Sequence, residues 1–426
     1  MRTLFVFLLL VGAGLPAYSQ PAPQGTSAPP SASARVLRAA RVIDGTGRVL
    51  PRHDVEIRDG RIVALRPSAG PLPAGGIDLG SRTLLPGLID THVHLGWYIN
   101  GRDRLHTDTD GDAPGVSALA HAGNAWATLQ AGFTTVQSIG EADNAPLRDA
   151  INRGLIPGPR VLTSLGSINE RTRGGSPDSL RAAVRYVKQL GADVIKIFAS
   201  QSIRDGGAAT MSPAQLEAVC GEAAAQGLRS VVHAHSADAA QRVARAGCSQ
   251  VEHGVFADDT TLALFAARGT WFDPQCGLVF RNYLDNKPWF DGIGNYNAAG
   301  FSAMERALPL AEAGIGRASR TAGVKLVFGT DAVAGAHGRN AEELVCRVRR
   351  GGQSAMDAIV SATSRAAESL NLGREIGRVS PGYAADLIAT DGDPSQEIEA
   401  ALRVSFVMRN GVVYRQQVAR AARGSH

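Results

Sequence analysis

A repeated order of helix, glycine and short apolar strand is the feature of this sequence that most restricts its fold. The segment SPDSLRAAVRYVKQLGADVIKIFAS begins with Ser176 as a predicted helix N-cap and Pro177 at the first helical position, and its helix is predicted to end near Gly191. The segment SPAQLEAVCGEAAAQGLRSVVHAHS repeats this order, with a capping box expected between Ser212 and Gln215. Helices that alternate with short strands predict an α/β fold with a parallel sheet.

Eight segments are predicted to form the strands of that sheet. They are residues 88–94, 133–138, 160–165, 193–198, 229–233, 249–253, 270–273 and 325–330. Eight parallel strands, each followed by a helix, close into a (β/α)8 barrel of the TIM type. Active sites of such barrels lie at the carboxyl ends of the strands, so reactive side chains are expected there.

The two ends of the chain have a different pattern. Short β-like runs with hairpin signals at Asp59-Gly60 and Asn410-Gly411 predict strands before and after the barrel. We therefore expect a small β-sandwich domain built from both chain ends. The expected bounds are 35–85 and 375–418 for the β-sandwich and 86–374 for the barrel.

The amino terminus is typical of an export signal. Residues 1–19 contain Arg2, an apolar run and small residues around Ala17, which predicts a cleaved signal peptide. Residues 20–34 are rich in Pro, Ser and Ala, as in a disordered linker. No later stretch reaches the roughly 20 apolar residues that a membrane span needs. We therefore expect a soluble protein that is secreted or periplasmic, with no membrane partner.

Charge and cysteine content narrow the possible partners. The formal net charge of +5 is small for 426 residues, and Lys and Arg do not cluster with aromatic residues, so nucleic-acid binding is not indicated. The four cysteines, which have no close spacing, are Cys220, Cys248, Cys276 and Cys346. An exported protein can form disulfides, but the sequence does not indicate which cysteines pair.

Six residues that can bind metal ions fall at the predicted strand ends. In LLPGLIDTHVHLGW, His92 and His94 alternate, so both imidazoles point to one face of a strand and can share one ion. The other four end or directly follow a predicted strand: Lys196, His233, His253 and Asp331.

Each of these residues also has a structural interpretation when taken alone. A histidine at a strand end is more often a hydrogen-bonded structural residue. Lys196 could extend its amine to water from a strand edge, and Asp331 could cap a turn or helix. Six metal-compatible residues at one end of one barrel are not expected by chance, so together they predict a metal centre.

These motifs resemble the amidohydrolase superfamily, in the binuclear-metal group that includes Xaa-Pro dipeptidase-like, imidazolonepropionase-like and ochratoxin-hydrolysing amidases. The resemblance extends over residues 36–415. It rests on PGLIDTHVHL, GADVIKIFAS, VVHAHS, VEHG, FGTDAVAGAHGRNAEEL and PGYAADLIATDGDP, which occur in this order. Members of this group often assemble into large homo-oligomers, so the resemblance also implies a homo-oligomer.

The resemblance implies a metal-binding function for the strand-end residues. His92 and His94 would bind one divalent ion. His233 and His253 would bind the other. Lys196 would bridge both ions as an N-carboxylated lysine, because burial lowers the pKa of its amine and a neutral amine can add carbon dioxide. Zinc is the ion expected from His, carboxylate and water ligands, and manganese, cobalt or iron would also fit.

The resemblance also implies a mechanism in which Asp331 contacts one ion and a bridging water. Two ions about 3.5 to 4 Å apart can lower the pKa of such a water and polarise a carbonyl. The bridging hydroxide would attack the carbonyl, and Asp331 would act first as general base and then as general acid for the leaving nitrogen. The expected substrate is a small amide beside a carboxylate: a dipeptide, an N-acyl amino acid or an ochratoxin-like amide. We therefore predict a metal-dependent hydrolase of C–N bonds.

Residues beside the motifs are candidates for supporting functions. Those that could hold a substrate carboxylate are His235, His337 and Arg339. For His235 a structural hydrogen bond is an equal alternative, and Arg339 could simply be solvated. Asp90 is expected to hydrogen-bond a ligating histidine. Glu252 is expected to point away from His253, in packing or in a salt bridge.

Two other functions remain open. A lactonase or cyclic-amide hydrolase would use the same metal centre, and a panel of amides and lactones would distinguish it. A non-catalytic binding protein of this fold would be expected to lack ligands, and none of the six is missing. A Ser-His-Asp mechanism is not indicated, because no GxSxG segment is present. The usual glycine-histidine-glycine segment after the third strand is TRGGSPDS here, without a histidine, so dipeptide specificity is not carried over.

Overall fold

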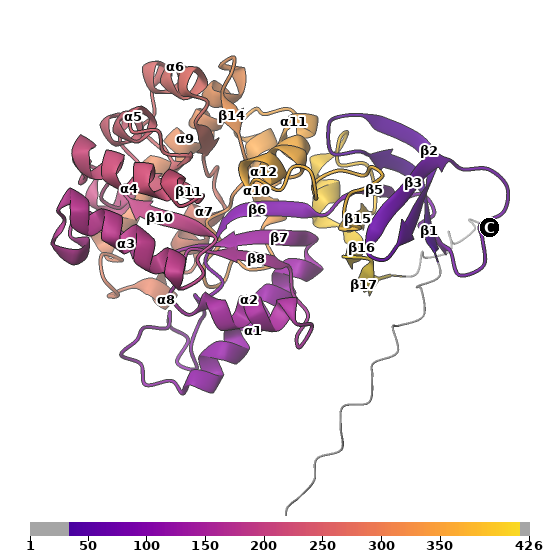
Figure 1. Cartoon of the computed structure of the whole chain (residues 1–426), viewed down its shortest axis with the longest axis horizontal. Coiled ribbons are helices and arrows are strands. Elements are labelled where there is room, and N and C mark those ends of the chain that lie inside the picture. Colours follow the sequence, from indigo (N-terminus) through magenta and orange to yellow (C-terminus); the bar gives the residue numbers. More distant parts are fainter. Residues whose placement is uncertain (1–33, 418–426) are drawn as a thin grey trace, which may run out of the picture. The chain divides into compact units, whose positions relative to one another are not determined.

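The computed structural model describes residues 34–417 (Figure 1). The expected signal peptide, residues 1–19, and the expected linker up to residue 33 lie outside this part of the chain. Among the helices within it, none is long and apolar enough to cross a membrane. The described chain contains two parallel sheets with their helices and one mixed sheet.

Nine of the described strands form the two parallel sheets. Their bounds are Leu88–Val93 (β6), Phe133–Ser138 (β7), Arg160–Thr163 (β8), Ser167–Ile168 (β9), Val194–Phe198 (β10), Arg229–Ala234 (β11), Gln250–His253 (β12), Trp271–Asp273 (β13) and Lys325–Leu326 (β14). One sheet has the order β6-β7-β8, and the other has the order β14-β13-β12-β11-β10-β9. Every pair in both sheets is parallel, which confirms the predicted α/β class.

Helices connect these strands in the predicted order. Their bounds are Pro114–Gln130 (α1), Asn144–Asn152 (α2), Pro177–Gln189 (α3), Pro213–Ala225 (α4), Ala237–Arg245 (α5), Asp259–Arg268 (α6), Leu278–Asp285 (α7), Lys287–Phe290 (α8), Ala298–Arg320 (α9), Ala341–Arg349 (α10), Ala355–Ser361 (α11) and Ser364–Ser369 (α12). Ser176 caps α3, and the reciprocal capping box of Ser212 and Gln215 begins α4. Gly191 adopts a left-handed φ of +89° after α3, a conformation that costs glycine little.

Backbone hydrogen bonds join the two parallel sheets at both edges of the three-stranded sheet. At the β8 edge, Asp193 N donates to Thr163 O over 2.8 Å. At the β6 edge, Asp331 N donates to His92 O over 2.8 Å, and His94 N donates to Ala332 O over the same distance. The carboxyl end of β6 therefore lies beside the segment that carries Asp331.

The mixed sheet contains strands from both ends of the chain, as predicted. Their bounds are Arg35–Ile43 (β1), Val49–Arg58 (β2), Arg61–Pro67 (β3), Ile77–Asp78 (β4), Thr83–Pro86 (β5), Leu387–Thr390 (β15), Val404–Arg409 (β16) and Val412–Gln416 (β17). The eight strands form one hydrogen-bonded sheet, where a β-sandwich has two. The reason is β5, which pairs with β1 on one side and with β15 on the other and so joins the two groups of strands.

The predicted hairpins are present in this sheet. Asp59 and Gly60 connect β2 to β3, and Asn410 and Gly411 connect β16 to β17. All four residues have positive φ, between +49° and +76°. Positive φ at both central residues is typical of the type I′ turns that suit the twist of a two-residue hairpin.

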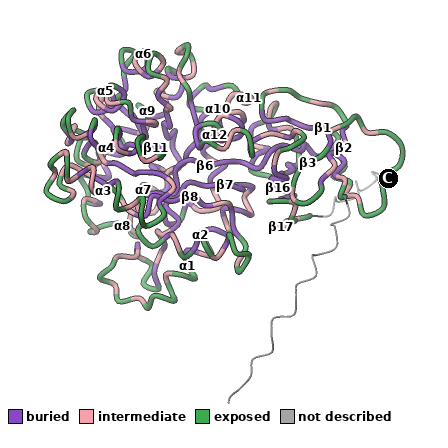
Figure 2. The backbone as a smooth tube through the Cα atoms, in the orientation of Figure 1, coloured by how far each residue is buried: buried purple, intermediate pink, exposed green. Residues whose placement is uncertain are grey.

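Burial follows the parallel strands (Figure 2). A large apolar cluster packs α3 to α6 against β10 to β13, and Leu216, Val243 and Phe265 are among its members. A disulfide between Cys220 and Cys248 lies in this cluster, a pairing that the sequence left open. The strands whose ends carry the predicted ligands are therefore fixed by core packing on their helical side.

Candidate metal centre and substrate pocket

The six predicted ligands line a single cavity of about 200 Å³. They are His92, His94, Lys196, His233, His253 and Asp331. Each lies at or just beyond the carboxyl end of a strand, as expected for this fold class. His253 and Asp331 have left-handed φ values of +68° and +54°. That conformation is strained for residues other than glycine, and strain of this kind collects at functional sites.

One group of side chains gathers around Asp331. Its Oδ1 lies 2.9 Å from His94 Nε2 and 3.3 Å from His92 Nε2. Burial disfavours the carboxylate, but His92 and His94 outweigh it and hold the pKa of Asp331 below its usual value. The three side chains are close enough to hold one metal ion.

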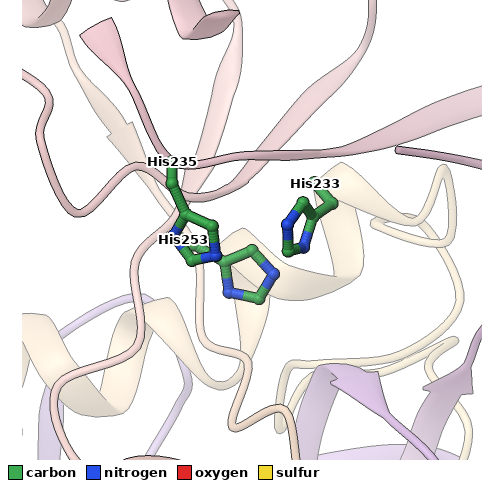
Figure 3. Close-up of side chains that lie close together, drawn as sticks. All are labelled: His233, His235 and His253. Carbon is green, nitrogen blue, oxygen red and sulfur yellow. The ribbon is translucent and has the colours of Figure 1, made fainter. Parts of the chain in front are cut away.

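A second group consists of three histidines on neighbouring strands (Figure 3). The ring centroids of His233 and His253 are 4.5 Å apart, and those of His235 and His253 are 4.7 Å apart. Burial lowers the pKa of both His233 and His253 well below the usual value, so both rings are neutral. Neutral imidazole is the form that binds metal. The structure thus places His235 in the same group as the two predicted ligands.

Lys196 lies between these two groups. Its side chain is only 1% exposed, so the interpretation of a lysine extending to water is wrong. Lys196 Nζ is 3.5 Å from His92 Nε2, and no ion pair within residues 34–417 includes it. Burial lowers the pKa of its amine. A lowered pKa increases the fraction of uncharged amine, which is the form that can add carbon dioxide.

Three of the histidine rings are oriented by a hydrogen bond from Nδ1, which leaves Nε2 available for a metal. The pairs are His92 with Glu252 (2.6 Å), His94 with Glu141 (2.5 Å) and His253 with Gln275 (2.7 Å). Glu252 was expected in packing or in a salt bridge, and its partner is the ring of His92, so it holds a ring of the candidate centre. Glu141 and Gln275 lie in loops, and no sequence motif pointed to them.

Asp90 does not bond a histidine ring, contrary to the expectation. Its carboxylate accepts hydrogen bonds from the backbone of His92 (3.1 Å), from the backbone and hydroxyl of Thr330 (3.0 and 2.7 Å) and from Asn340 Nδ2 (2.8 Å). Burial raises the pKa of Asp90 to about 7. Asp90 therefore fixes the turn before Asp331 to the end of β6.

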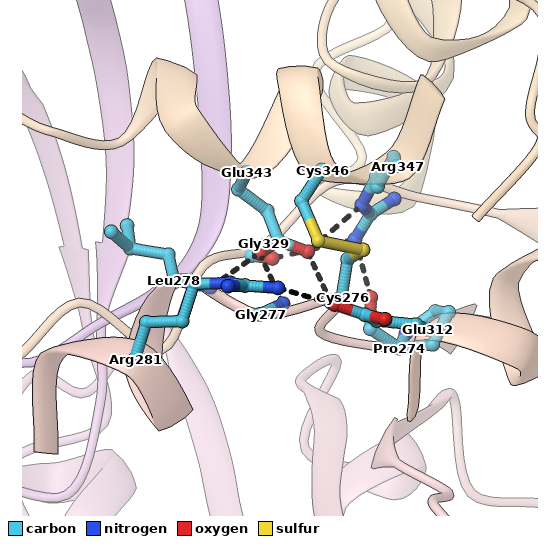
Figure 4. The surroundings of a disulfide bond; sticks show 10 residues. All are labelled: Pro274, Cys276, Gly277, Leu278, Arg281, Glu312, Gly329, Glu343, Cys346 and Arg347. Atoms are coloured by element: carbon cyan, nitrogen blue, oxygen red, sulfur yellow. Dashed lines mark hydrogen bonds and ion pairs between the residues drawn. A yellow bond between two sulfur atoms is a disulfide. The ribbon is translucent and has the colours of Figure 1, made fainter. Parts of the chain in front are cut away.

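The loop that carries Gln275 is attached to α10 (Figure 4). A disulfide joins Cys276 to Cys346. The carboxylate of Glu343 accepts hydrogen bonds from the backbone of residues 276–278, with 3.0 Å to the nitrogens of Gly277 and Leu278. Arg347 binds the oxygen of Pro274 over 2.6 Å. These bonds hold the residues on both sides of Gln275, which in turn orients His253.

Two of the three predicted substrate-binding residues lie outside the ligand cavity. His337 and Arg339 line a separate cavity next to α1 and α10. Arg339 is paired with Glu342 over 2.8 Å, and His337 Nε2 donates to the backbone oxygen of Trp97 over 3.3 Å. Each side chain binds a partner outside the ligand cavity, Glu342 for Arg339 and the backbone of Trp97 for His337, and the sequence did not predict these contacts. His235 does line the ligand cavity.

Much of the remaining lining of the ligand cavity is apolar. Its residues come from the end of β10, from α7 and α9 and from irregular segments, and apart from Phe198 and Val333 they lie outside the sequence motifs. Its residues include Trp97, Phe198, Val279, Phe280, Tyr283, Tyr296, Met304 and Val333. We call this set the aromatic wall. A polar cluster facing an apolar wall is the usual arrangement of a small-molecule site.

The donor atoms suit divalent metal ions. Neutral imidazoles with one carboxylate are the ligands that zinc and similar ions prefer. His92, His94 and His253 each form a hydrogen bond through Nδ1 to a carboxylate or amide oxygen, as histidines that bind metal through Nε2 usually do. The fit is chemical as well as geometric, because unpaired buried histidines and a buried lysine would otherwise be costly.

This chain is similar in sequence and in fold to several known proteins. Ochratoxinase from Aspergillus niger is 28% identical over 433 residues, covering 90% of this chain and 87% of that protein. A solved Xaa-Pro dipeptidase with bound methionine in the active site is 28% identical, with a TM-score of 0.80 and coverage of 90% of this chain and 100% of that one. A prolidase complexed with N-methylphosphonate-L-proline is 26% identical, with a TM-score of 0.79 and the same coverage.

The match to a whole family covers most of the chain. Residues 83–414 match the amidohydrolase family, and they include every candidate ligand and the aromatic wall. The chain therefore belongs to the amidohydrolase family and is a hydrolase that acts on C–N amide bonds.

Proposed function

We propose that this chain is an exported, binuclear metal-dependent amidohydrolase that cleaves an amide or peptide bond next to a carboxylate. The observation that carries the proposal is that one cavity brings the buried Lys196 together with two sets of candidate ligands: His92, His94 and Asp331 in one set, and His233 and His253 in the other. The relatives named ochratoxinase, prolidase and Xaa-Pro dipeptidase support an amide or dipeptide substrate.

The ligand groups suggest how two divalent ions, with zinc as the expected metal, would be held. His92 and His94 serve one ion. His233 and His253 serve the other. Lys196 lies between them, and its neutral Nζ adds carbon dioxide to give a carbamate while one proton is released to solvent. In this form Lys196 would join the histidines as a residue that holds the metal ions.

Asp331 is the proposed general base and acid. When bound, the metal ions supply a water of lowered pKa and a polarised substrate carbonyl. Asp331 accepts the proton of the attacking water and later donates it to the nitrogen of the leaving amine. Its neighbours His92 and His94 keep its pKa low, so the carboxylate is ionised before the proton arrives. The aromatic wall limits the access of bulk water.

Three features of the whole protein belong to the same proposal. The two parallel sheets close into a (β/α)8 barrel over residues 86–374, a closure supported by the hydrogen bonds at both edges of the three-stranded sheet. Export is supported by the sequence of residues 1–19 and by the two disulfides, which persist in oxidising compartments. The active protein is a homo-oligomer.

Metal content tests this function directly. Elemental analysis of the purified protein should give about two divalent ions per chain, the number a bridged site needs. Lys196→Ala should lose most of the metal and the activity, whereas Lys188→Ala, at an exposed lysine of α3, should keep both. One ion or none in the wild type, unchanged in Lys196→Ala, would refute the binuclear site. A substrate panel of dipeptides, N-acyl amino acids and lactones completes the test, and cleavage of lactones alone would favour the lactonase alternative.

A further inference from the structure

One cation lies in the ligand cavity apart from the metal-type cluster. Arg204 is the only arginine among the residues that line the cavity, and Lys196, the one lysine, belongs to the candidate centre. The residues that surround Arg204 on that side belong to the aromatic wall. A single positive charge in a mainly apolar chamber points to a single negative charge on the ligand.

The guanidinium of Arg204 is held in place without an acidic partner. Arg204 Nε donates to Asn295 Oδ1 over 2.5 Å, and the guanidinium carbon lies 3.9 Å from the ring centroid of Tyr296. Within residues 34–417, no ion pair includes Arg204, and its side-chain hydrogen bond is made by Nε and not by the terminal nitrogens. Its two Nη groups therefore remain available in a fixed plane, the geometry with which arginine binds a carboxylate through two parallel hydrogen bonds.

Two buried polar atoms beside Arg204 also lack partners in the described chain. The hydroxyl of Tyr296, a side chain 5% exposed, accepts and donates no hydrogen bond. Nδ1 of His235, which is 3% exposed, is unpartnered as well. Both residues line the cavity. Buried polar groups are normally hydrogen-bonded, so a polar ligand group is the natural partner of these atoms.

We propose that Arg204, with Tyr296 and His235, binds the carboxylate of the substrate, and that the aromatic wall beside it selects an apolar side chain next to that carboxylate. This inference rests on the proposed function, because it assumes that the scissile amide lies at the metal-type cluster. The carboxylate then lies at Arg204, and the apolar side chain packs on residues such as Val279, Phe280 and Met304. The sequence predicted His337 and Arg339 as the residues that bind the carboxylate, but they line another cavity, and Arg204 is assigned this function instead.

A pair of compounds that differ only in the carboxylate tests this assignment. N-Acetyl-L-phenylalanine and N-acetyl-2-phenylethylamine have the same amide and the same ring. Wild-type holoenzyme should prefer the first compound by about 30-fold or more in kcat/KM, the factor expected for a charged two-bond contact. Arg204→Gln should remove most of this preference by raising KM for the carboxylate compound, with kcat nearly unchanged and the neutral compound unaffected. Arg204→Lys, which keeps the charge but not the fork, should fall between.

The matched control is Arg306→Gln, which removes one positive charge at an exposed position of α9. It should leave the preference intact. Equal losses for both compounds in Arg204→Gln, or an unchanged preference, would overturn the assignment. If the metal-loaded wild type cleaves neither compound, the proposed function is judged by the metal content and the wider substrate panel, and calorimetric binding of the same two compounds decides the assignment of Arg204 separately. Tighter binding of the carboxylate compound that is lost in Arg204→Gln would support the assignment, and equal binding would overturn it.

Discussion

The two sides of the ligand cavity differ in how their residues are held. On the strand side, each candidate ligand sits at the end of a packed parallel strand, and the rings of His92, His94 and His253 have a second hydrogen bond that sets their orientation. The aromatic wall comes from the end of β10, from α7 and α9 and from irregular segments, and its side chains are mostly apolar. Chemistry and substrate selection are therefore assigned to separate elements. Substitutions on the strand side should change kcat or metal affinity, and substitutions in the aromatic wall should change KM.

The largest effect is expected on the strand side, at Asp331. Asp331→Asn keeps the size of the side chain but cannot accept the proton, so kcat should fall by about 1,000-fold, within the range for loss of a general acid–base. Because Asp331 is also a candidate metal ligand, kcat is compared per metal ion bound by the variant, and KM should change little. Steady-state kinetics and elemental analysis measure these quantities. Asp285→Asn, at an exposed position near the end of α7, is the control and should behave as the wild type. If Asp331→Asn keeps the wild-type kcat, Asp331 is not the residue that transfers the proton.

The next largest effect is expected from Gln275. Gln275→Ala removes the bond that orients His253, so affinity for metal should fall by about 10- to 100-fold, as for other partners of ligating histidines. Titration against a chelator of known affinity would measure this loss. Gln353→Ala, at another buried glutamine, which bonds Asp357 instead, is the matched control. Equal metal affinity in the two variants would show that the orientation of His253 does not depend on Gln275.

The strand side is also the part of the site that could be predicted from sequence. The candidate ligands follow from the order of strands, because residues at the carboxyl ends of parallel strands come together wherever the helices lie. Glu252 was expected to point away from His253, in packing or in a salt bridge, and its pairing with the ring of His92 was not predicted. Strict alternation fails there because His253 turns out of the strand with a φ of +68°, so Glu252 can face His92 while His253 still reaches the cavity.

The rest of the site and one part of the fold depend on long-range contacts that a local pattern does not contain. Glu141 and Gln275 reach their histidines from loops, and Arg204 comes from a single short turn after β10. The strands of both chain ends were predicted, but their union into one sheet was not. It depends on β5, whose partner β1 lies about 40 residues before it and whose partner β15 lies about 300 residues after it. Cysteine pairing likewise required the packing of α4 and α10 to be known.

A smaller effect should distinguish the two disulfides. Replacing Cys276 and Cys346 by serine frees the loop of Gln275 from α10, yet Glu343 still binds that loop. We therefore expect a loss of metal affinity of only about ten-fold, at the low end of the effects on groups around a ligand. Replacing Cys220 and Cys248 should lower the melting temperature without changing metal affinity, because that bond lies in the helical core. Equal metal affinity in the two double variants would show that the Cys276–Cys346 disulfide does not contribute to metal binding.

The smallest effect is expected for a substitution in the aromatic wall. It tests directly whether substrate selection and chemistry reside on separate sides of the cavity. Phe280→Ala removes buried apolar contact from the cavity, so KM for a substrate with an apolar side chain should rise by about five-fold, as for a modest loss of apolar burial. Both kcat and the metal content should stay near the wild-type values, because Phe280 touches neither proton transfer nor the ligands. Kinetics on N-acyl derivatives of phenylalanine and alanine would show whether the rise in KM follows the size of the side chain. A fall in kcat or in metal content would mean that the wall also positions the strand-end residues, and the separation of chemistry from selection would then be wrong.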